Sequence, residues 1–221
     1  MRGPAAGLRR LKDLHGRGYR AVAGVDEVGR GCLAGPVVAA AVILDDAQPV
    51  RGLRDSKLLT AADRERLALR LRSRARAVGV GVADEREIDA LNILRATLLA
   101  MRRALEALRV RPDYVIVDAL TLPGLPIPQE GVIGGDRTCA PIAAASIVAK
   151  VHRDGLMRRL HQSWPAYGFA LHKGYGTDAH LEALRKHGAS PVHRLTFRGV
   201  RHPDELTALP FPRPEEAAEE I

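Results

Sequence analysis

Four acidic residues follow apolar stretches of this sequence: Asp26, Glu27, Asp118 and Asp136. Each stands where a short apolar run of the kind that forms a buried strand comes to an end. Several carboxylates in one crevice repel one another, so a protein that gathers them needs compensating cations. Mg²⁺ suits such a site because it is a hard ion, commonly held by a few carboxylates together with phosphate oxygens and waters. Two such ions about 3.5–4 Å apart can activate a water and stabilise a leaving oxygen in phosphoryl displacement. The acids therefore indicate a metal site for phosphodiester chemistry.

For any one of these acids taken alone, a helix-capping or solvated role is an equally good interpretation. Asp136 in particular precedes a predicted helix closely enough to cap it. The metal-site interpretation therefore depends on the acids meeting in space, which requires the strands that carry them to be neighbours.

A glycine-rich stretch, Gly29-Arg30-Gly31, follows the first two acids directly. Successive side chains on a strand face opposite ways, so Asp26 and Glu27 diverge unless the strand ends or twists there. Glycine allows this, and it lets backbone N–H and C=O groups approach a ligand without an obstructing Cβ. A dinucleotide-binding loop would need a helix at these glycines. Because Pro36 and an apolar run follow, we expect a strand instead, while an ordinary hairpin turn with solvated acids remains an open alternative.

The apolar patterning predicts the elements that must position these residues. Strands are expected at 19–27, 36–44, 78–83 and 113–118, with a further short apolar run over 132–136; helices are expected at 60–77, 87–108, 140–160 and 177–186. A short amphipathic helix carrying Leu8, Leu11 and Leu14 is expected before them. If the strand ending at Asp26 is central and the one ending at Asp118 runs beside it, their acids converge at one end of the sheet.

Length and charge narrow the class of protein. The 221 residues suffice for one sizeable α/β domain with a small appendage. Lys and Arg number 34 against 26 Asp and Glu, a net charge of +8, which favours a polyanionic partner such as nucleic acid or anionic lipid. Aromatic residues make up only 4%, which argues against a single-strand-binding surface built from stacked rings.

Cysteine usage and hydropathy indicate a compartment. Cys32 and Cys139 are the two cysteines of the chain, and they form neither a disulfide framework nor a zinc-ligand spacing. No apolar run of signal-peptide length occurs in the first 20 residues, and no later run approaches a membrane span. We therefore expect a soluble, cytoplasmic protein with no membrane partner.

Six motifs, taken in order, resemble those of the ribonuclease HII family (type 2 ribonuclease H), and the resemblance extends over about residues 18 to 200. The motifs are Asp26-Glu27-Val28-Gly29-Arg30-Gly31, Asp55-Ser56-Lys57, Val117-Asp118, Gly135-Asp136, the stretch 143–151 with Arg153-Asp154, and His172-Lys173-Gly174-Tyr175-Gly176-Thr177. A single motif of this kind would be weak, since short motifs often match by chance.

The resemblance implies a fold and an activity. The fold is α/β: a ribonuclease H-like mixed five-stranded sheet flanked by helices, with a C-terminal helical appendage. It suggests a helical extension over 1–18, a catalytic domain over 19–160, and a helical region and tail over 161–221. The implied activity is an endonuclease that hydrolyses the RNA strand of RNA–DNA hybrids and incises 5′ of ribonucleotides embedded in duplex DNA. It leaves a 3′-hydroxyl and a 5′-phosphate, and it uses two Mg²⁺ or Mn²⁺ ions.

The resemblance also implies residue roles. The four acids would bind the metal ions, Gly29, Arg30 and Gly31 would read the ribose 2′-hydroxyl, and Tyr175 would pack on the adjacent deoxyribose. Further substrate contacts are expected from Lys57, Ser146, Lys150, Arg153, His172 and Lys173. Asp154 is expected to orient Arg153 or Lys150. Arginines scattered elsewhere are expected on solvated faces.

The chain departs from the family pattern at three positions. Gly134 stands where the family usually has lysine, Ala119 where glycine is common, and Cys32 where proline is frequent. None of these changes removes a carboxylate. Two alternatives remain open from the sequence: a catalytically silent hybrid-binding protein, and another ribonuclease H-like metal nuclease such as a junction resolvase. We expect a monomer; the sequence does not identify protein partners, a replication clamp included.

Overall fold

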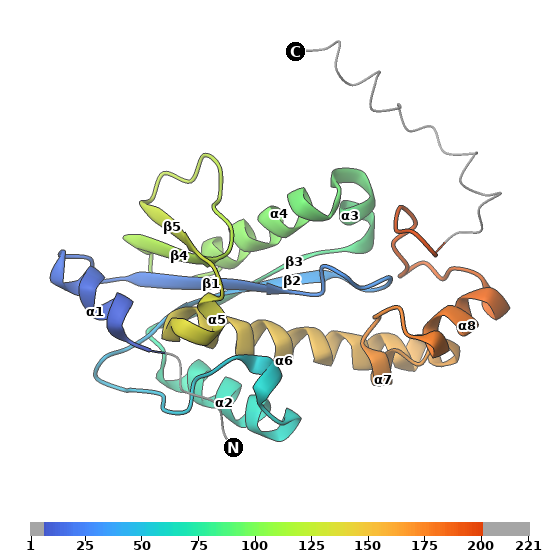
Figure 1. Cartoon of the computed structure of the whole chain (residues 1–221), viewed down its shortest axis with the longest axis horizontal. Helices are drawn as coiled ribbons and strands as arrows, with labels where there is room; N and C mark the ends of the chain where they lie inside the picture. The colour runs from blue at the N-terminus through green and yellow to red at the C-terminus, as the bar shows by residue number, and fades with distance from the viewer. Residues whose placement is uncertain (1–6, 201–221) are drawn as a thin grey trace, which may run out of the picture.

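The computed structural model describes residues 7–200, which form a mixed sheet with helices on both faces (Figure 1). The five strands lie in the order β3-β2-β1-β4-β5. They are β1 (Val22–Val28), β2 (Val37–Ile43), β3 (Ala77–Ala83), β4 (Tyr114–Asp118) and β5 (Gln129–Val132). β1 pairs antiparallel with β2 and parallel with β4, while β2–β3 is antiparallel and β4–β5 parallel. The strand carrying Asp26 is therefore central with the strand ending at Asp118 beside it, as predicted.

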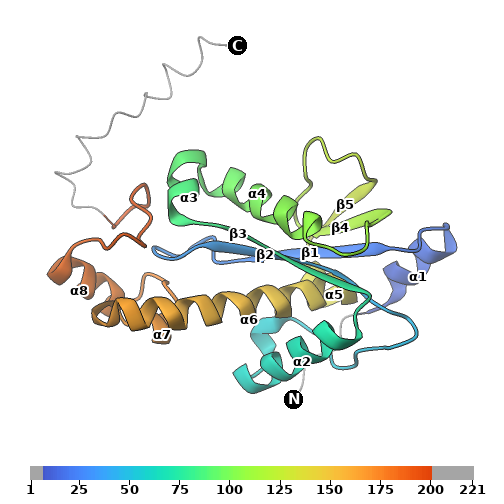
Figure 2. The same cartoon turned by 180° about the vertical axis from the view of Figure 1, so that it is seen from behind.

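The helices form a layer on each face of the sheet. They are α1 (Arg9–Gly16), α2 (Ala61–Arg74), α3 (Glu85–Leu91), α4 (Ile93–Glu106), α5 (Gly135–Thr138), α6 (Ala140–Ser163), α7 (Phe169–His172) and α8 (Asp178–His187), with short 3₁₀ turns η1 (Ser56–Leu58) and η2 (Pro165–Tyr167). α3 and α4 cover one face, and the long α6 with α2 covers the other (Figures 1 and 2).

Small side chains bring α6 close to the sheet. Every residue of β2 is buried, and β2 consists of valine, alanine and a terminal isoleucine. At Gly24 of β1, a Cβ would lie 2.2 Å from the carbonyl carbon of Pro141 in α6, so only glycine fits between strand and helix. The alanine run at the start of α6 packs on the same face. Close packing of this kind holds the ends of β1 and α6 in a fixed relation.

Two predictions about elements were wrong. The single helix expected over 87–108 is two helices, because Asn92 adopts φ +68° and its side chain accepts a hydrogen bond from the Arg95 N–H, which caps α4. α3 has its own capping box, formed by Asp84 and Glu87. The apolar period continues through the break, so periodicity alone could not reveal it. Asp136 does not end a strand either: β5 ends at Val132, and Asp136 lies in α5.

The other predicted elements are confirmed within a few residues. α2 begins after the Thr60 cap and ends at Arg74, a few residues before the expected 77, where β3 begins. α8 begins after Thr177 and ends before Gly188. α6 continues without a break past the expected boundary at 160, and the three-part division of the chain stays a prediction. The expected C-terminal tail lies outside the described residues.

None of the helices within residues 7–200 combines the length and the apolar composition that crossing a bilayer requires.

Candidate active site

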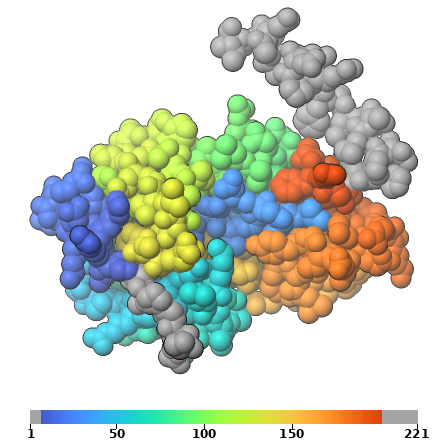
Figure 3. Space-filling model, viewed as in Figure 1, coloured from blue at the N-terminus to red at the C-terminus, as the bar shows by residue number. Residues whose placement is uncertain are grey.

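The four acids line one cavity of about 150 Å³ at the end of the central strands. Its other lining residues are Val28, Ser56, Lys57, Ser146, Lys150 and Tyr175. Figure 3 shows the segments that surround it on one face: the blue residues around β1 and β2, the yellow residues near α5, the cyan residues near η1, and the orange residues of the later helices. The tertiary structure thus brings together residues from six separate parts of the sequence.

The register of the sheet explains why Asp26 and Glu27 both reach this cavity. β4 pairs with β1 only as far as Val25 opposite Val117, so that edge of β1 is open beyond this pair. Asp26 is nearly buried, at 5% exposed, and lies opposite the small side chain of Ala40 on β2. Glu27 would face the other side of the sheet by alternation, yet it also lines the cavity.

Asp118 and Asp136 are joined by a backbone contact. Asp118 is the last residue of β4, and its Oδ1 accepts a hydrogen bond from the Gly135 N–H at 2.8 Å. This bond fixes the start of α5, and so the position of Asp136, against the end of β4. Neither α5 nor α6 has a side-chain hydrogen bond at its N-cap. The capping interpretation of Asp136 is therefore wrong.

Burial and mutual repulsion perturb the acids. Burial raises the pKa of Asp26 well above its ordinary value, and the neighbouring charges of Glu27 and Asp118 raise it further. Burial also raises the pKa of Glu27, although Arg30 opposes the shift. The pKa of Asp118 is raised by burial, against a lowering contribution from the Gly135 hydrogen bond. These shifts mean that the anionic forms are held at a cost that a cation would offset.

The donor set fits a hard divalent cation. Its side-chain donors are carboxylate and hydroxyl oxygens, and Oε2 of Glu27 is buried without a hydrogen-bond partner. Within residues 7–200, no group of three or more His, Cys, Asp or Glu side chains converges tightly enough to hold an ion without adjustment. The four carboxylates share the cavity but stay spread around it, as like charges favour.

Cations already lie beside these acids. Lys57 Nζ is 3.7 Å from Asp136 Oδ2, and Arg30 Nη1 is 3.5 Å from Glu27 Oε1. The Lys57 side chain is 81% exposed, so this pair is weak and the ammonium is free to move toward a phosphate.

The serines and Lys150 complete the lining. The hydroxyls of Ser56 and Ser146 are 2.9 Å apart, which ties η1 to α6. Lys150 Nζ donates to Asp154 Oδ1 at 2.7 Å. Of the two partners considered for Asp154, Lys150 is the one that makes this hydrogen bond, whereas no hydrogen bond joins Asp154 to Arg153 within the described residues.

The glycine-rich stretch forms a turn that leads directly into β2, so no dinucleotide-binding helix opens there. Gly29 has φ +97°, and a Cβ at this position would lie 2.2 Å from Arg153 Nε. Arg153 is fully buried and donates to the carbonyls of Ala34, Pro36 and Lys173 at 2.8 to 3.1 Å. The expected phosphate contact does not fit this placement, because the guanidinium supports the turn from inside.

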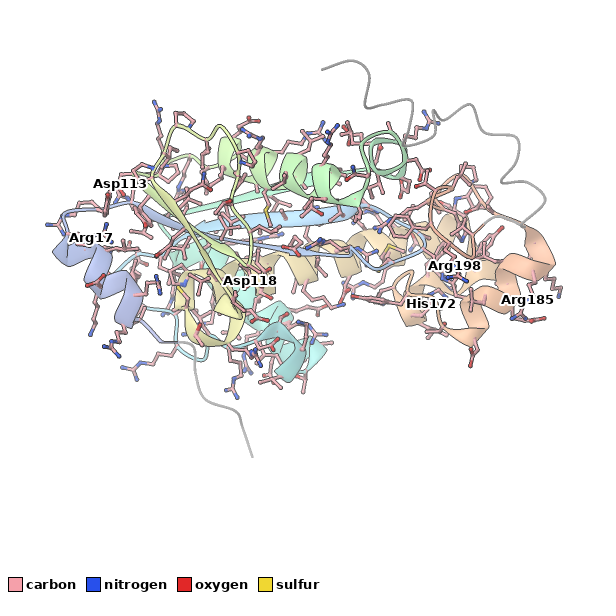
Figure 4. All side chains as sticks on the ribbon, turned by 45° about the horizontal axis from the view of Figure 1, so that its top comes forward. Arg17, Asp113, Asp118, His172, Arg185 and Arg198 are labelled. Atoms are coloured by element: carbon pink, nitrogen blue, oxygen red, sulfur yellow. The ribbon has the colours of Figure 1, made fainter. Side chains whose placement is uncertain are left out.

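Tyr175 lines the cavity and is 44% exposed. His172 and Lys173, which were also expected to contact substrate, do not line the cavity. Both ring nitrogens of His172 are engaged, with the Tyr167 carbonyl at 2.6 Å and the Gly174 N–H at 3.1 Å. Lys173 Nζ donates to the Ala170 carbonyl. Figure 4 places His172 well away from Asp118. His172 and Lys173 therefore shape the segment that carries Tyr175 and do not line the carboxylate cavity.

Sequence reasoning missed Arg194. It is fully buried, and its guanidinium donates to the carbonyls of Gly29 and Arg30 at 2.7 and 2.9 Å. The expectation that arginines outside the motifs lie on solvated faces is wrong here. No spacing pattern distinguishes this arginine from its neighbours in the sequence, because its partners are backbone atoms more than 150 residues away.

The mixed five-stranded sheet and its helical layers are those of the ribonuclease H class of enzymes. The solved ribonuclease H2 from Pyrococcus horikoshii OT3 is similar over 82% of this chain and 96% of its own, with a TM-score of 0.70 and 29% sequence identity.

The chain belongs to the ribonuclease HII family, whose profile matches residues 23–200. Ribonuclease HII from Desulfitobacterium hafniense is 55% identical over 194 residues, 88% of this chain and 75% of that protein. Ribonuclease HII 2 from Methylibium petroleiphilum is 59% identical over 180 residues, 81% of this chain and 83% of that protein. Members of this family cleave the RNA of RNA–DNA hybrids, so this chain is a ribonuclease H enzyme.

Proposed function

We propose that this enzyme, besides cleaving RNA–DNA hybrids, incises duplex DNA on the 5′ side of an embedded ribonucleotide. It does so with two divalent cations, Mg²⁺ or Mn²⁺, and leaves a 3′-hydroxyl and a 5′-phosphate. The observation that carries the proposal is the cavity in which four acids from β1, β4 and α5 meet Tyr175. The Gly29–Gly31 turn follows directly after β1, the strand that carries two of these acids.

Asp26, Glu27, Asp118 and Asp136 would hold the cations. When bound, these cations supply activation of the attacking water and stabilisation of the leaving 3′ oxygen. The chain itself fixes the donor positions through the Gly135–Asp118 hydrogen bond and the burial of Asp26. Lys57 and Lys150 line the same cavity, where ammonium groups stabilise the phosphate charge of the bound strand.

The turn at Gly29–Gly31 would recognise the ribose. A 2′-hydroxyl is both a donor and an acceptor, and it distinguishes RNA from DNA at a single position. A Cβ at Gly31 would meet no protein atom within 4 Å, so that side of the turn is open to a ligand. Tyr175, partly exposed at the cavity, would pack on the next deoxyribose and so test the junction between RNA and DNA.

Cleavage of a DNA duplex that contains one ribonucleotide tests this function directly. With Mg²⁺ or Mn²⁺ we expect a single incision 5′ of the ribonucleotide, and none in the same duplex made wholly of DNA or in the presence of EDTA. Binding without incision would contradict the proposal. Cleavage of an all-DNA junction with indifference to ribose would favour the resolvase alternative.

Tyr175→Ala tests the role of the tyrosine on the same substrates. We expect the loss of rate to be about tenfold larger on the single ribonucleotide than on a long hybrid, since stacking on one sugar or base is worth roughly 1–3 kcal/mol. Tyr175→Phe keeps the ring and serves as the control. Equal losses on the two substrates would contradict a junction-testing role.

A further inference from the structure

Two consecutive buried residues, His193 and Arg194, are linked by hydrogen bonds to the two elements proposed to read the ribose: Arg194 directly, and His193 through His180. Arg194 Nη2 and Nη1 donate to the carbonyls of Gly29 and Arg30 at 2.7 and 2.9 Å, and Nε donates to the Gly35 carbonyl at 2.9 Å. Burial lowers the pKa of Arg194 to about 10, so the guanidinium stays charged at neutral pH. A charged, planar fork therefore holds the Gly29–Gly31 turn and the residues that lead from it into β2.

This contact determines which backbone groups the turn presents. In a planar trans peptide, the C=O of one residue and the N–H of the next point in opposite directions. Arg194 draws the carbonyls of Gly29 and Arg30 toward the interior. The N–H groups of Arg30 and Gly31 must then point away from Arg194, toward the open side of the turn, where they can donate to a ligand oxygen.

His193 reaches Tyr175 through a second histidine. The Ser190 N–H donates to His193 Nδ1 at 3.0 Å, so the proton of the neutral His193 ring is on Nε2. That nitrogen is 3.0 Å from His180 Nε2, which must accept, and His180 Nδ1 then donates to the Tyr175 carbonyl at 2.9 Å. Both rings are buried, and burial lowers the pKa of each, so one neutral proton arrangement satisfies the whole series.

The backbone of the same segment ties the two elements together. The Arg194 N–H donates to the Leu33 carbonyl at 2.9 Å, and the Leu33 N–H donates to the Gly174 carbonyl at 2.8 Å. The turn and the residue preceding Tyr175 are thus joined through Leu33. A displacement of residues 193 and 194 would move both reading elements at once.

We propose that His193 and Arg194 are positioning residues for ribose recognition: Arg194 presents the Arg30 and Gly31 N–H groups, and His193 holds the Tyr175 backbone through His180. The inference rests on the proposed function of the turn and of Tyr175. It adds that specificity for an isolated ribonucleotide depends on two residues that touch neither substrate nor metal.

The test compares kcat/KM on a duplex with one ribonucleotide with kcat/KM on a uniform hybrid. The ratio of the two does not depend on how much enzyme is folded, so a merely structural role leaves it unchanged. A uniform hybrid offers a 2′-hydroxyl in every register, whereas the duplex offers a single one. Arg194→Lys keeps the charge but loses the fork, and we expect it to lower the ratio about tenfold, the effect of one lost buried hydrogen bond.

His193 provides a matched pair of variants. His193→Phe keeps the ring packing but removes the donor to His180, and we expect it to lower the ratio. His193→Gln restores a donor amide near the position of Nε2, and we expect it to recover most of the ratio. Leu71→Ala, in the core of α2 away from this segment, is the destabilised control and keeps the wild-type ratio.

A parallel loss on both substrates in Arg194→Lys and His193→Phe, with the ratio unchanged, would overturn the inference. If Arg194→Lys does not fold, the histidine pair decides. The backbone amide resonances of Arg30 and Gly31 give a readout independent of catalysis: we expect Arg194→Lys to shift them and Leu71→Ala to leave them in place. Unshifted amides would refute the positioning role, whereas failure of the wild-type enzyme to incise the single ribonucleotide would refute the proposed function instead.

Discussion

The carboxylate cavity lies next to the Gly29–Gly31 turn, taken together with residues 32–36 that connect it to β2, but the two are built in opposite ways. The cavity takes charged side chains from regular elements, and their charges repel one another. The turn offers backbone atoms from an irregular segment, and two buried arginines satisfy its carbonyls. Carboxylates that bind a cation can lack some of their hydrogen-bond partners in the protein, because the cation replaces them. A backbone segment that recognises a ligand must instead be fixed in one conformation by hydrogen bonds from the rest of the protein. Variants in each region distinguish these two kinds of construction.

The largest effect is expected from Asp118→Asn. An amide is a poor metal ligand and brings no negative charge, so we expect kcat to fall by about a thousandfold, or about 4 kcal/mol in activation free energy. The amide oxygen can still accept the Gly135 hydrogen bond, and the repulsion in the cavity decreases. The melting temperature should therefore be unchanged or higher.

Asp113→Asn is the matched control for that variant, because Asp113 lies near the opposite end of β4, where it accepts hydrogen bonds from the Arg20 and Ala21 N–H groups (Figure 4). We expect it to lose some stability and to keep its activity. Near-normal turnover in Asp118→Asn would remove Asp118 from the site.

A pair of glycine variants separates support of the turn from access to it. Gly29→Ala places a Cβ against Arg153 at a backbone φ of +97°, and we expect it to lower the free energy of unfolding by roughly 1–3 kcal/mol. Gly31→Ala meets no protein atom within 4 Å, so stability should change by less than about 0.5 kcal/mol. We expect incision at a single ribonucleotide to fall about tenfold or more in both. Denaturant unfolding and cleavage rates together measure the difference, and a fully active Gly31→Ala would argue against ligand approach on that side.

We expect the two buried histidines behind Tyr175, His180 and His193, to make the free energy of unfolding fall at acidic pH. Burial among the rings of Tyr167, Phe169 and His180 lowers the pKa of His193 from 6.5 to about 4. The unfolded chain therefore binds a proton more readily than the folded one. This contribution is complete above pH 6.5 and is lost as the pH falls toward 4.

Urea unfolding at pH 7 and pH 5 measures this loss. His193→Gln removes the titrating group and should flatten the profile between these values. A wild-type profile that is already flat would show that His193 is not held neutral.

The smallest effect is expected from Ala119→Gly, directly after Asp118. Ala119 has φ +53°, a conformation that costs an alanine about 1 kcal/mol and a glycine little. The greater conformational entropy of glycine in the unfolded chain offsets part of this gain. We therefore expect a net increase in the free energy of unfolding of roughly 0.5 kcal/mol. The same denaturant experiment measures it. A decrease in the free energy of unfolding would show that added backbone flexibility next to Asp118 costs more stability than relief of the positive φ provides.

Much of the cavity could be predicted from the sequence, because its residues follow local rules. Asp118 ends β4 as expected, Asp26 lies two residues before the end of β1, and Thr60 and Thr177 cap helices where expected. The misplacement of Asp136 and the unseen break at Asn92 share a cause. Short polar elements interrupt apolar patterns without changing their period, so the pattern continues through them.

The supports of the turn could not be predicted in this way. Arg153 was expected to contact phosphate, and Arg194 was expected to be solvated, because a surface arginine and a buried one have the same sequence signal. Only the presence of unpaired carbonyls nearby makes burial of a guanidinium favourable. Those carbonyls belong to Gly29, Arg30 and Ala34, far away in the chain.

The order of the amino acids by itself determined the kind of chemistry, the strands that carry the acids, and the family to which the chain belongs. Such features depend on residue type and short spacing, which a linear sequence records completely. The tertiary structure decided which arginines are buried, which histidines form one hydrogen-bonded series, and which way the turn presents its amides. These depend on atoms that meet only after folding, where the free energy of burying a polar group depends on the partner it finds.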